Sequence, residues 1–527
     1  MTQVNYQEIL NEVCGDAVKR SQIYNGNEIY LDVEADFLPA MARYIGRTLG
    51  AVLVNVIGTD ERPIDGCFRL YYVFSFDRTD QFLILRVSLP ADNPSYPSVA
   101  PILHAAGGYE REIQDLLGLK PVGHPNPRRL VHHERWPEGV YPLRKDFDVK
   151  SRPEWASGEW HVRPVSGEGV FEVPVGPVHA GIIEPGHFRF SVVGETVLDL
   201  TARLFYKHRG VEKLAEGKPF DQACILAERV SGVGSFSHAT AFCQAVERIA
   251  GIDIPERAKF LRTLFLEMER LYNHVGDIGN LCAGTGLVVA QAQGAILKER
   301  LMRMNERVSG HRYLFGANGP GGVRRDITEV QALDILKTLE GVEKEFALLM
   351  ALIQTSNSNM DRLENTGALT AQAARDHSVV GPAGRASGID RDTRRDHPHA
   401  AYDRVRFSVP VYHYGDALAR MRVRVDEVKE SIGIIRQVLS SLPKGEYFLP
   451  LPTVPAYRIG LGYTESPRGE ALHWVMTGPG NTIYRLKVRS PSFCNWQVVP
   501  LTVPGAIIPD FPLINKSFEL SYAGNDR

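Results

Sequence analysis

The sequence predicts an α+β protein: an N-terminal α+β domain followed by a mainly α-helical domain with small terminal strands. Three observations support this prediction. The chain has 527 residues, which is more than one compact domain usually holds. Strand-like stretches rich in β-branched and aromatic residues crowd the first 90 residues. Helical periodicity dominates from about residue 221 to residue 353.

The first domain is expected to be a small sheet with helices packed on it. Four stretches have the composition of strands: residues 27–34, 51–59, 66–76 and 81–90. The turn-prone stretch 77–80 joins the last two in a hairpin. Residues 36–50 predict a helix that Asp36 opens, and residues 108–119 predict a short charged helix that ends at Gly118. Such a mixture favours an α+β domain.

The second domain is expected to be a helical bundle. Residues 254–282 predict a long helix that begins near Pro255. One face of it carries Phe260, Leu264, Met268 and Leu271. Residues 327–353 predict another long amphipathic helix. Between the domains, residues 121–170 are rich in Pro, Gly, His and Arg and show no period. The predicted division is therefore 1–120, a docking arm and linker over 121–170, and 171–527.

Composition excludes several classes of protein. The formal net charge is -2, which provides no attractive field for nucleic acid. No apolar run reaches the length of a membrane helix, and the N-terminus lacks the features of a signal peptide. The six cysteines are well separated, and none forms a C-x-x-C pair. We therefore expect reduced thiols, a cytoplasmic location and no iron–sulfur cluster held by this chain.

Three sequence blocks occur in order between Glu110 and Phe147. They are ERE-x-x-D-x-x-G from Glu110 to Gly118, then GHP from Gly123, then PLRKDF ending at Phe147. This segment resembles the signature of the smaller hydrophilic subunit of respiratory complex I. The resemblance implies a structural role, in which a basic, proline-rich arm wraps neighbouring subunits. GHPNPRR alone would predict only a solvated loop.

From Gly176 onward the chain resembles the large subunit of nickel–iron hydrogenases and its homologue, the quinone-site subunit of complex I. The matching blocks include GPVHAGIIEPGHFRF, FYKHRGVEKLAEG, AERVSGVGSFSHATAF, VGPAGRASGIDRDTRRDHP and PRGEALHWVMTG. The pattern is most like the large subunit of formate hydrogenlyase, of the hydrogenase-4 type, in which both domains are fused in this order. The resemblance also implies an oxidoreductase related to NADH dehydrogenases, with links to quinone binding and NAD binding.

The sequence departs from the hydrogenase pattern at all four nickel-ligand positions. Hydrogenases of this type carry R-x-C-G-x-C near the start of the bundle and D-P-C-x-x-C near the C-terminus. Matching these motifs places Ser231 and Gly234 at the first two cysteines, and Ser521 and Gly524 at the others. A serine hydroxyl is a hard ligand that is not ionised at neutral pH, and glycine has no side chain. We therefore expect no metal, no hydrogen chemistry and no cofactor bound by this chain.

Quinone chemistry is an alternative that the resemblance leaves open. The complex I homologue binds quinone with a tyrosine just after this loop and a histidine in the first hairpin. An ungapped match places Phe242 at the tyrosine position, and phenylalanine donates no hydrogen bond. In the hairpin, His187 and His179 are the candidates. These residues would form a vestigial quinone pocket.

Five further residues are expected either to transfer protons or to line the cavity left by the absent metal ligands. They are Glu212, His238, Arg229, Arg385 and Asp390. Glu212 matches the glutamate that hydrogenases use to carry protons, and its pKa is expected to rise on burial. The alternative is an ion pair with Lys213 or Arg209 on a solvated helix face. For His238 the alternative is an ordinary core histidine. Residues 385–397 form a dense charge run, which is either a solvated surface or, as the resemblance implies, a set of internal ion pairs.

The sequence thus predicts a catalytic-subunit homologue in a membrane-attached complex, without a nickel–iron site, that couples electron transfer to proton or ion movement. The expected partners are an iron–sulfur small subunit, a ferredoxin-like subunit and antiporter-like membrane subunits, with no nucleic acid. The chain would lie peripherally on the cytoplasmic side of the membrane. Two alternatives stay open: a non-redox structural or coupling subunit, and a quinone-reducing subunit.

Overall fold

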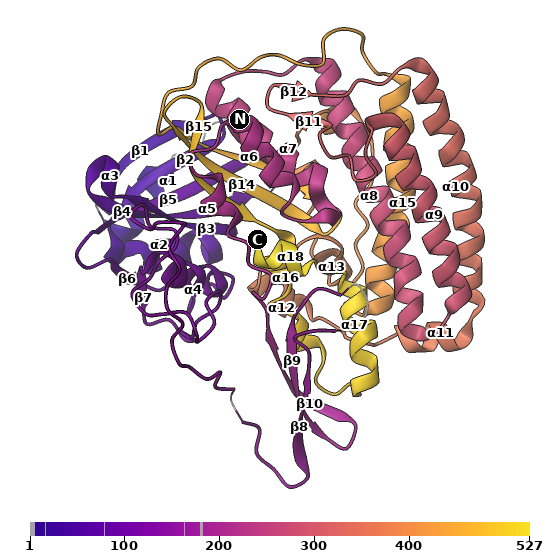
Figure 1. Ribbon diagram of the computed structural model, residues 1–527, viewed down its shortest axis with the longest axis horizontal. Coiled ribbons are helices and arrows are strands. Elements are labelled where there is room, and N and C mark those ends of the chain that lie inside the picture. The colour runs from indigo at the N-terminus through magenta and orange to yellow at the C-terminus, as the bar shows by residue number, and fades with distance from the viewer. Residues whose placement is uncertain (1–5, 16, 78, 163, 180–182) are drawn as a thin grey trace. The chain divides into compact units, whose positions relative to one another are not determined.

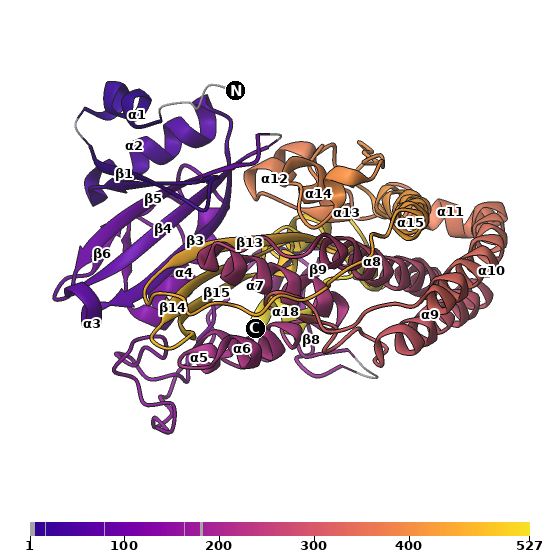
Figure 2. The same cartoon turned by 90° about the horizontal axis from the view of Figure 1, so that it is seen from above.

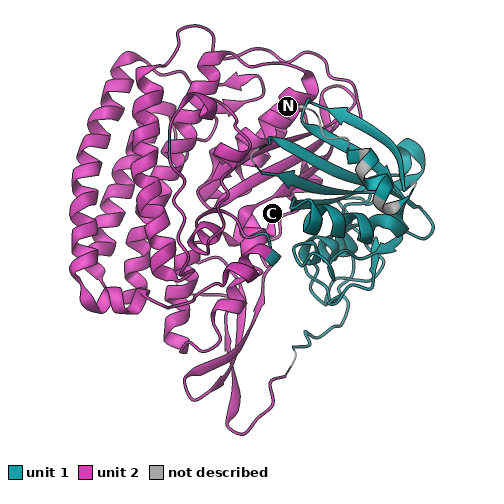
Figure 3. Ribbon diagram, turned by 180° about the vertical axis from the view of Figure 1, so that it is seen from behind, with its two compact units in different colours: residues 1–163, 376–378 teal, residues 164–375, 379–527 magenta. Residues whose placement is uncertain are grey.

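The computed structural model describes residues 6–527 except 16, 78, 163 and 180–182. It divides into two compact units (Figure 3). Unit 1 holds residues 1–163 with 376–378, and unit 2 holds residues 164–375 with 379–527. Helices and strands occur in both units, so the predicted α+β class is confirmed.

Unit 1 is built on a sheet with strand order β1-β2-β5-β4-β3. Its strands are β1 Val18–Tyr24, β2 Glu28–Val33, β3 Val52–Glu61, β4 Cys67–Phe76 and β5 Gln81–Pro90. Strands β2 and β5 are parallel, whereas the other neighbours are antiparallel. The predicted hairpin of the last two strands is confirmed, and its register runs from Cys67 opposite Pro90 to Phe76 opposite Gln81.

Short helices and a two-stranded sheet complete unit 1. They are α1 Tyr6–Cys14, α2 Leu38–Arg43, α3 Arg62–Asp65, α4 Ala106–Leu117, β6 Ser95–Pro97 and β7 Lys120–Val122. Helix α4 packs on β3 and ends at Gly118, whose φ of 73° lies in the left-handed region that glycine adopts without strain. In α4, Asp115 accepts hydrogen bonds from the backbone of residues 130–132, and Arg111 donates to the carbonyls of Arg128 and Arg129. The first sequence block thus anchors the start of the predicted arm.

Unit 2 begins with an antiparallel sheet of order β10-β9-β8. Its strands are β8 Val170–Val175, β9 His187–Val193 and β10 Thr196–Arg203. The helices that follow are α5 Val211–Ala215, α6 Phe220–Glu228, α7 Ser235–Ala250, α8 Glu256–Thr285, α9 Val288–Ser309, α10 Glu329–Thr355, α11 Asn357–Leu363, α12 Ala371–Asp376, α13 Gly381–Ala386, α14 Thr393–Asp396 and α15 Ala417–Ser440. Between α9 and α10 lie the short strands β11 Asn318–Gly319 and β12 Gly322–Val323.

The long helices α8, α9, α10 and α15 lie side by side (Figures 1 and 2). They enclose a large apolar core, which includes the predicted stripe of α8: Phe260, Leu264, Met268 and Leu271. Burial of that stripe removes apolar surface from water, and this burial stabilises the bundle. The predicted helical domain is therefore confirmed.

A second sheet lies inside unit 2, with order β13-β14-β15. Its strands are β13 Ile459–Ser466, β14 Gly469–Gly478 and β15 Thr482–Arg489. Every residue of β13 and β14 is buried, and helix α7 packs against both strands. The contact between α7 and β13 is close at Gly462, where a Cβ atom would lie 1.8 Å from the carbonyl oxygen of Ala241. Three short helices end the chain: α16 Pro491–Asn495, α17 Phe511–Phe518 and α18 Tyr522–Asp526.

Candidate functional site

The loop from Ser231 to Gly234 lies between α6 and α7, and helix α8 holds it in place. The side-chain amide of Asn273 donates to the carbonyl of Val233 at 3.0 Å. The carboxyl group of Glu269 accepts a hydrogen bond from the backbone N–H of Phe236 at 2.7 Å, in the first turn of α7. A buried carboxylate at this helix start satisfies backbone donors that the helix itself leaves unpaired. The loop geometry is therefore set by α8.

Arg209 brings this loop together with the C-terminal segment 521–524. Its guanidinium donates to the carbonyls of Arg229 at 2.6 Å and Val230 at 2.9 Å. The same group donates to the carbonyl of Ala523 at 3.0 Å. One side chain thus bridges the two segments that contain the four positions matched to the hydrogenase cysteines.

The four positions offer a poor donor set for a soft transition metal. The Oγ of Ser231 is buried and has no hydrogen-bond partner among the residues that the structure describes. The Oγ of Ser521 accepts the backbone N–H of Gly524 at 2.9 Å and so caps α18. Gly234 and Gly524 supply no side-chain atom. Two neutral hydroxyl groups do not replace four thiolates, so these residues do not fit a nickel–iron centre.

The thiols of unit 2 lie at other positions. Cys224 on α6 and Cys243 on α7 face each other, with their Sγ atoms 3.6 Å apart. The Sγ of Cys494 lies 3.8 Å from the carbonyl oxygen of Ser490. Within the described parts of the chain, no cluster of three or more His, Cys, Asp and Glu side chains is arranged to hold a metal ion.

Glu212 lies on α5 in a cluster of cations. Its carboxylate contacts Arg485 at 2.9 Å, Lys487 at 3.4 Å and Arg527 at 3.3 Å, and it accepts the backbone N–H of Val488 at 3.1 Å. Burial by itself raises the pKa of this carboxyl, but Lys487, Arg485 and Arg527 together bring the pKa below its ordinary value. The predicted rise in the pKa of Glu212 is therefore wrong, because three cations outweigh desolvation.

The alternative partners of Glu212 also differ from those that the sequence suggested. Lys213 pairs with Glu216 at 2.9 Å, and Arg209 donates to backbone carbonyls. Glu212 is 5% exposed, so it does not lie on a solvated helix face. Its cation partners come mainly from β15 and from the C-terminus, which lie far away in the sequence.

His238 lies in the first turns of α7 and is fully enclosed. Its Nδ1 lies 3.0 Å from Nε2 of His473, a residue of β14. Burial and, to a smaller extent, the nearby charge of Arg527 lower the pKa of His238 to about 3. The pKa of His473 is likewise lowered by burial and by His238. Both imidazoles are therefore neutral at pH 7.

Arg229 is half-exposed at the end of α6. Its guanidinium lies 4.1 Å from the centre of the Phe315 ring and 3.4 Å from the carboxylate of Glu228. It thus makes one cation–π contact and one long ion pair. The backbone carbonyl of Arg229 accepts a hydrogen bond from Arg209. Arg229 therefore contributes this carbonyl, rather than its guanidinium, to the contacts that position the loop.

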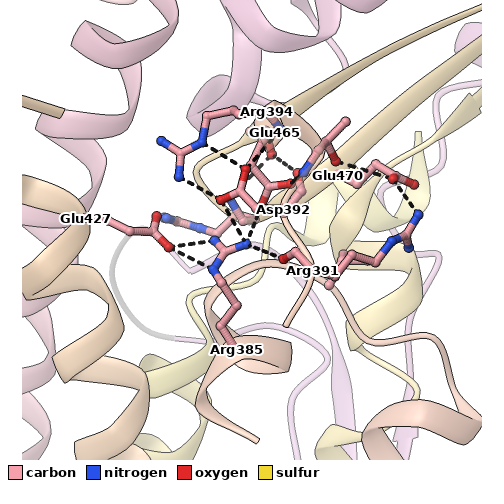
Figure 4. A network of polar contacts seen from close by, with 12 residues as sticks. Arg385, Arg391, Asp392, Arg394, Glu427, Glu465 and Glu470 are labelled. Carbon is pink, nitrogen blue, oxygen red and sulfur yellow. Dashed lines mark hydrogen bonds and ion pairs between the residues drawn. The ribbon is translucent and has the colours of Figure 1, made fainter. Parts of the chain in front are cut away.

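The charge run 385–397 lies mostly in the interior. Figure 4 shows the polar contacts of its residues Arg385, Arg391, Asp392 and Arg394. Arg385, on α13, donates to Glu427 of α15 at 2.6 Å and to Glu465 of β13 at 2.9 Å. Asp390 differs, because it is exposed and pairs with Arg395 at 2.6 Å. The structure thus places Arg385 inside and Asp390 at the surface.

The buried ions continue as one connected network. Arg394 pairs with Asp392 at 2.7 Å and with Glu267 of α8 at 3.2 Å, and Arg391 pairs with Glu470 of β14 at 2.9 Å. A small cavity borders this network, lined in part by the side chains of Arg385, Arg391, Thr393, Glu465 and Glu470. Burial and the neighbouring Asp392 raise the pKa of Glu465. The network therefore contains one carboxyl that can take up a proton more readily than an ordinary glutamate.

The three quinone-pocket candidates lie in two different apolar surroundings. His187 is the first residue of β9, and His179 lies in the segment before it, where its Nε2 is 2.7 Å from the carbonyl oxygen of Gly186. The pKa of His187 is lowered by burial. Phe242, on α7, packs in the apolar cluster of α5, α6, α7, β14 and β15, and its ring centre lies 6.4 Å from that of His473.

Sequence reasoning missed His473, Arg527 and Glu269, which complete the surroundings of the loop. His473 stands inside the block PRGEALHWVMTG, which carried the resemblance, but a single histidine in a strand has no periodic signal. Glu269 looks like one more charge on a long helix. Their roles depend on partners that are remote in the sequence.

Comparisons with known protein families match three successive parts of the chain. Residues 31–153 match the 30 Kd subunit of respiratory-chain NADH dehydrogenase. Residues 209–284 match the nickel-dependent hydrogenases. Residues 286–459 and 453–527 match the 49 Kd subunit of respiratory-chain NADH dehydrogenase. In the part of the chain that the structure describes, each helix is too short or too polar to cross a membrane.

Individual relatives support the same assignment. Formate hydrogenlyase subunit 5 of Escherichia coli is 36% identical over 99% of this chain and 93% of its own length. Hydrogenase-4 component G of the same organism is 34% identical over 95% of this chain and 88% of its own length. A solved structure of a membrane-bound sulfane sulfur reductase, described as an archaeal respiratory membrane complex, contains a chain with 30% identity and a TM-score of 0.65. The match covers 69% of this chain and 100% of that one. The protein therefore belongs to the family of oxidoreductase subunits that fuse 30 kDa and 49 kDa complex I-type domains and include formate hydrogenlyase subunit 5.

Proposed function

We propose that this chain is the catalytic-subunit homologue of a membrane-attached oxidoreductase complex and that it holds no nickel–iron centre. The observation that carries the proposal is the donor set: Ser231, Gly234, Ser521 and Gly524 at the four positions where hydrogenases carry cysteines. Arg209 holds the two segments that contain these positions together, although the residues at the positions are not cysteines. Hydrogen is therefore not the substrate of this site.

The complex transfers electrons and couples this transfer to proton or ion movement. One relative is named a sulfane sulfur reductase, and this name supports a role for the fold in respiratory membrane complexes that are not hydrogenases. The proposed partners are an iron–sulfur small subunit that delivers electrons, a ferredoxin-like subunit and antiporter-like membrane subunits. The chain lies at the cytoplasmic face of the membrane and is held there by its partners.

The buried network supports the coupling part of this proposal. A change of charge near the loop acts on ions in a region of low dielectric, where Coulomb interactions are stronger than in water. Glu465, whose pKa is already raised, responds by binding or releasing a proton. Arg385 and Glu427 extend the network to helix α15. In this way the redox state of the site biases a distant element.

Two alternatives belong to other classes of function. In the first, the chain is a non-redox structural or coupling subunit of an antiporter-like complex, and the loss of metal ligands supports this reading. In the second, it is a quinone-reducing subunit, and the histidines His179 and His187 near the first hairpin support that reading. Phe242 weighs against the second, because it supplies neither a proton nor a hydrogen bond.

Metal analysis and a redox titration of the purified complex test the proposal. We expect iron from partner clusters, no stoichiometric nickel and no dihydrogen evolution. A second sample with Ser231→Cys, Gly234→Cys, Ser521→Cys and Gly524→Cys measures whether thiolates alone restore nickel binding. One nickel per wild-type chain would overturn the proposal. A complex without any redox-active centre would support the non-redox structural subunit, and quinone-dependent turnover would support the quinone-reducing subunit.

A further inference from the structure

A pair of buried histidines lies beside the vacated loop. His238 of α7 is 1% exposed and His473 of β14 is 0% exposed. Their facing nitrogens, Nδ1 of His238 and Nε2 of His473, are 3.0 Å apart, which is the distance of a direct hydrogen bond. The two rings therefore share one proton between them.

The shared bond couples the protonation of the two outer nitrogens. A neutral imidazole carries one N–H group and one bare nitrogen. When His238 donates through Nδ1, its outer Nε2 is bare, and the outer Nδ1 of His473 carries a proton. When His473 donates through Nε2, its outer Nδ1 is bare, and the outer Nε2 of His238 carries a proton. Passing from one arrangement to the other leaves both rings neutral only when a proton enters at one outer nitrogen as another leaves the opposite outer nitrogen, because moving the shared proton alone would create an imidazolate and an imidazolium.

We propose that His238 and His473 form a proton relay between the loop 231–234 and the interior of the β13-β14-β15 sheet. One passage binds a proton at Nδ1 of His473, moves the shared proton to His238 and releases a proton from Nε2 of His238. The reverse passage moves a proton in the opposite direction. One proton enters and one leaves, no electrons move within the pair, and either rotation of both imidazole rings or a passage in the reverse direction restores the starting arrangement.

One end of the histidine pair faces the loop 231–234, and the other end is a buried nitrogen without a hydrogen-bond partner among the described residues. A Cβ atom built on Gly234 would lie 3.6 Å from Cδ2 of His238, so the ring edge that bears Nε2 faces the loop. At the other end, Nδ1 of His473 is buried and has no hydrogen-bond partner in the described parts of the chain. Buried polar atoms are nearly always satisfied, and an exception calls for a functional or solvent-filled explanation. Exchange of a proton at Nδ1 of His473 would explain why this nitrogen has no fixed partner.

The surroundings explain why the pair rather than Glu212 carries the proton. Glu212 is held in its charged form by Arg485, Lys487 and Arg527, so it exchanges protons poorly at neutral pH. Its negative charge nevertheless acts on His473, and the positive charge of Arg527 acts on His238. This field favours an incoming proton at the His473 end. The relay deepens the proposed function, because it assumes that protons are consumed or released at the loop.

The test uses the purified complex with [15N]histidine in this chain, in the wild type and in His473→Gln. Glutamine retains a hydrogen bond to His238 but has no second tautomer. His399→Gln is the matched control, because His399 is also buried and neutral, with its pKa lowered to about 4, but lies outside the pair. Nitrogen NMR at pH 7 reports the protonation of each ring nitrogen. In parallel, dithionite reduces the complex in weakly buffered solution while an indicator dye records proton uptake.

We expect a spin coupling between Nδ1 of His238 and Nε2 of His473, and shifts intermediate between protonated and bare nitrogen because two tautomers interchange. In His473→Gln, proton uptake should slow roughly 100-fold, the range of a lost proton-transfer group, while the number of electrons accepted stays the same. His399→Gln should leave both readouts unchanged. A fixed single tautomer in both rings, or an imidazolium ring at pH 7, would overturn the relay. If no variant accepts electrons, the proposed function fails, and the NMR result still decides on the relay.

Discussion

Two fully buried carboxyl groups show how partners decide protonation at the scale of single residues. Glu212 faces three cations, which lower its pKa against the effect of burial. Glu269 instead accepts hydrogen bonds from Ser237 and from the backbone N–H groups of Phe236 and Ser237. These bonds offset burial only in part, so the pKa of Glu269 is raised to about 7. Glutamates of the same domain thus differ in charge state near neutral pH.

Glu269→Gln should flatten the pH dependence of stability between about pH 4.5 and pH 7. In the wild type the folded state binds a proton at Glu269 that the unfolded state has already lost in this range. The free energy of unfolding therefore falls as pH rises, by at most about 1.4 kcal/mol per pH unit. Urea denaturation of the full chain at several pH values measures the slope. Equal slopes in wild type and variant would show that Glu269 is ionised throughout.

Glu212→Gln should destabilise the chain by about 3–5 kcal/mol, because it leaves Arg485, Lys487 and Arg527 without their buried counter-charge. Since the pKa is lowered in the folded state, this contribution is present above the ordinary glutamate pKa and is lost as pH falls below it. Glu212→Asp, which keeps the charge, should lose less. Chemical denaturation at pH 7 and pH 4 is the measurement, and a variant as stable as the wild type at pH 7 would refute the assignment.

At the scale of elements, the site depends on the packing of α7 onto β13 and β14. This helix carries His238 and Phe242, and β14 carries His473. The close approach at Gly462 sets their separation, because a side chain there would collide with the backbone of Ala241. Glycine is therefore required at this position by contact rather than by backbone dihedral angle.

Gly462→Ala should destabilise the chain by about 3 kcal/mol or more, since the added methyl group forces α7 away from the sheet. It should also weaken the hydrogen bond between His238 and His473, which nitrogen NMR detects. Gly433→Ala in α15 is the control: a Cβ there meets no atom within 4 Å, so the change should stabilise the helix by about 0.5–1 kcal/mol. Similar thermal stabilities for the two variants would contradict the steric argument.

At the scale of the whole molecule, unit 2 contains an ionic core as well as an apolar one. Arg385 links α13, α15 and β13 through Glu427 and Glu465, and Arg394 links the same region to α8 through Glu267. Buried ion pairs contribute little net stability against apolar replacements, yet breaking one leaves an uncompensated charge. The network therefore specifies how these elements meet.

Glu427→Gln should cost about 3–5 kcal/mol, because Arg385 and Arg270 lose a buried partner. The pKa of Glu427 is lowered in the folded state, so this contribution disappears as pH falls below the ordinary glutamate range. Glu343→Gln, which removes a surface ion pair with Arg436, should have little effect. Thermal unfolding of both variants distinguishes them, and equal losses would mean that the network is not stabilising.

Much of the architecture follows from the sequence. The hairpin of β4 and β5, the end of α4 at Gly118 and the apolar stripe of α8 were all predicted, because each depends on residues close together in the chain. The prediction that Ser231, Gly234, Ser521 and Gly524 stand at the hydrogenase cysteine positions also rests on local patterns, the two short motifs.

Only the tertiary structure decided the charge states and the pairing of the site. Strands β13 and β14 are fully buried although they carry Glu465 and Glu470, and the remote residues Arg385 and Arg391 pair with these two carboxylates. The pKa of Glu212 and the contact of His238 with His473 likewise depend on groups separated by more than 200 residues. Local sequence determines helices, strands and motifs, whereas Coulomb and hydrogen-bond energies depend on distances that only the folded chain sets.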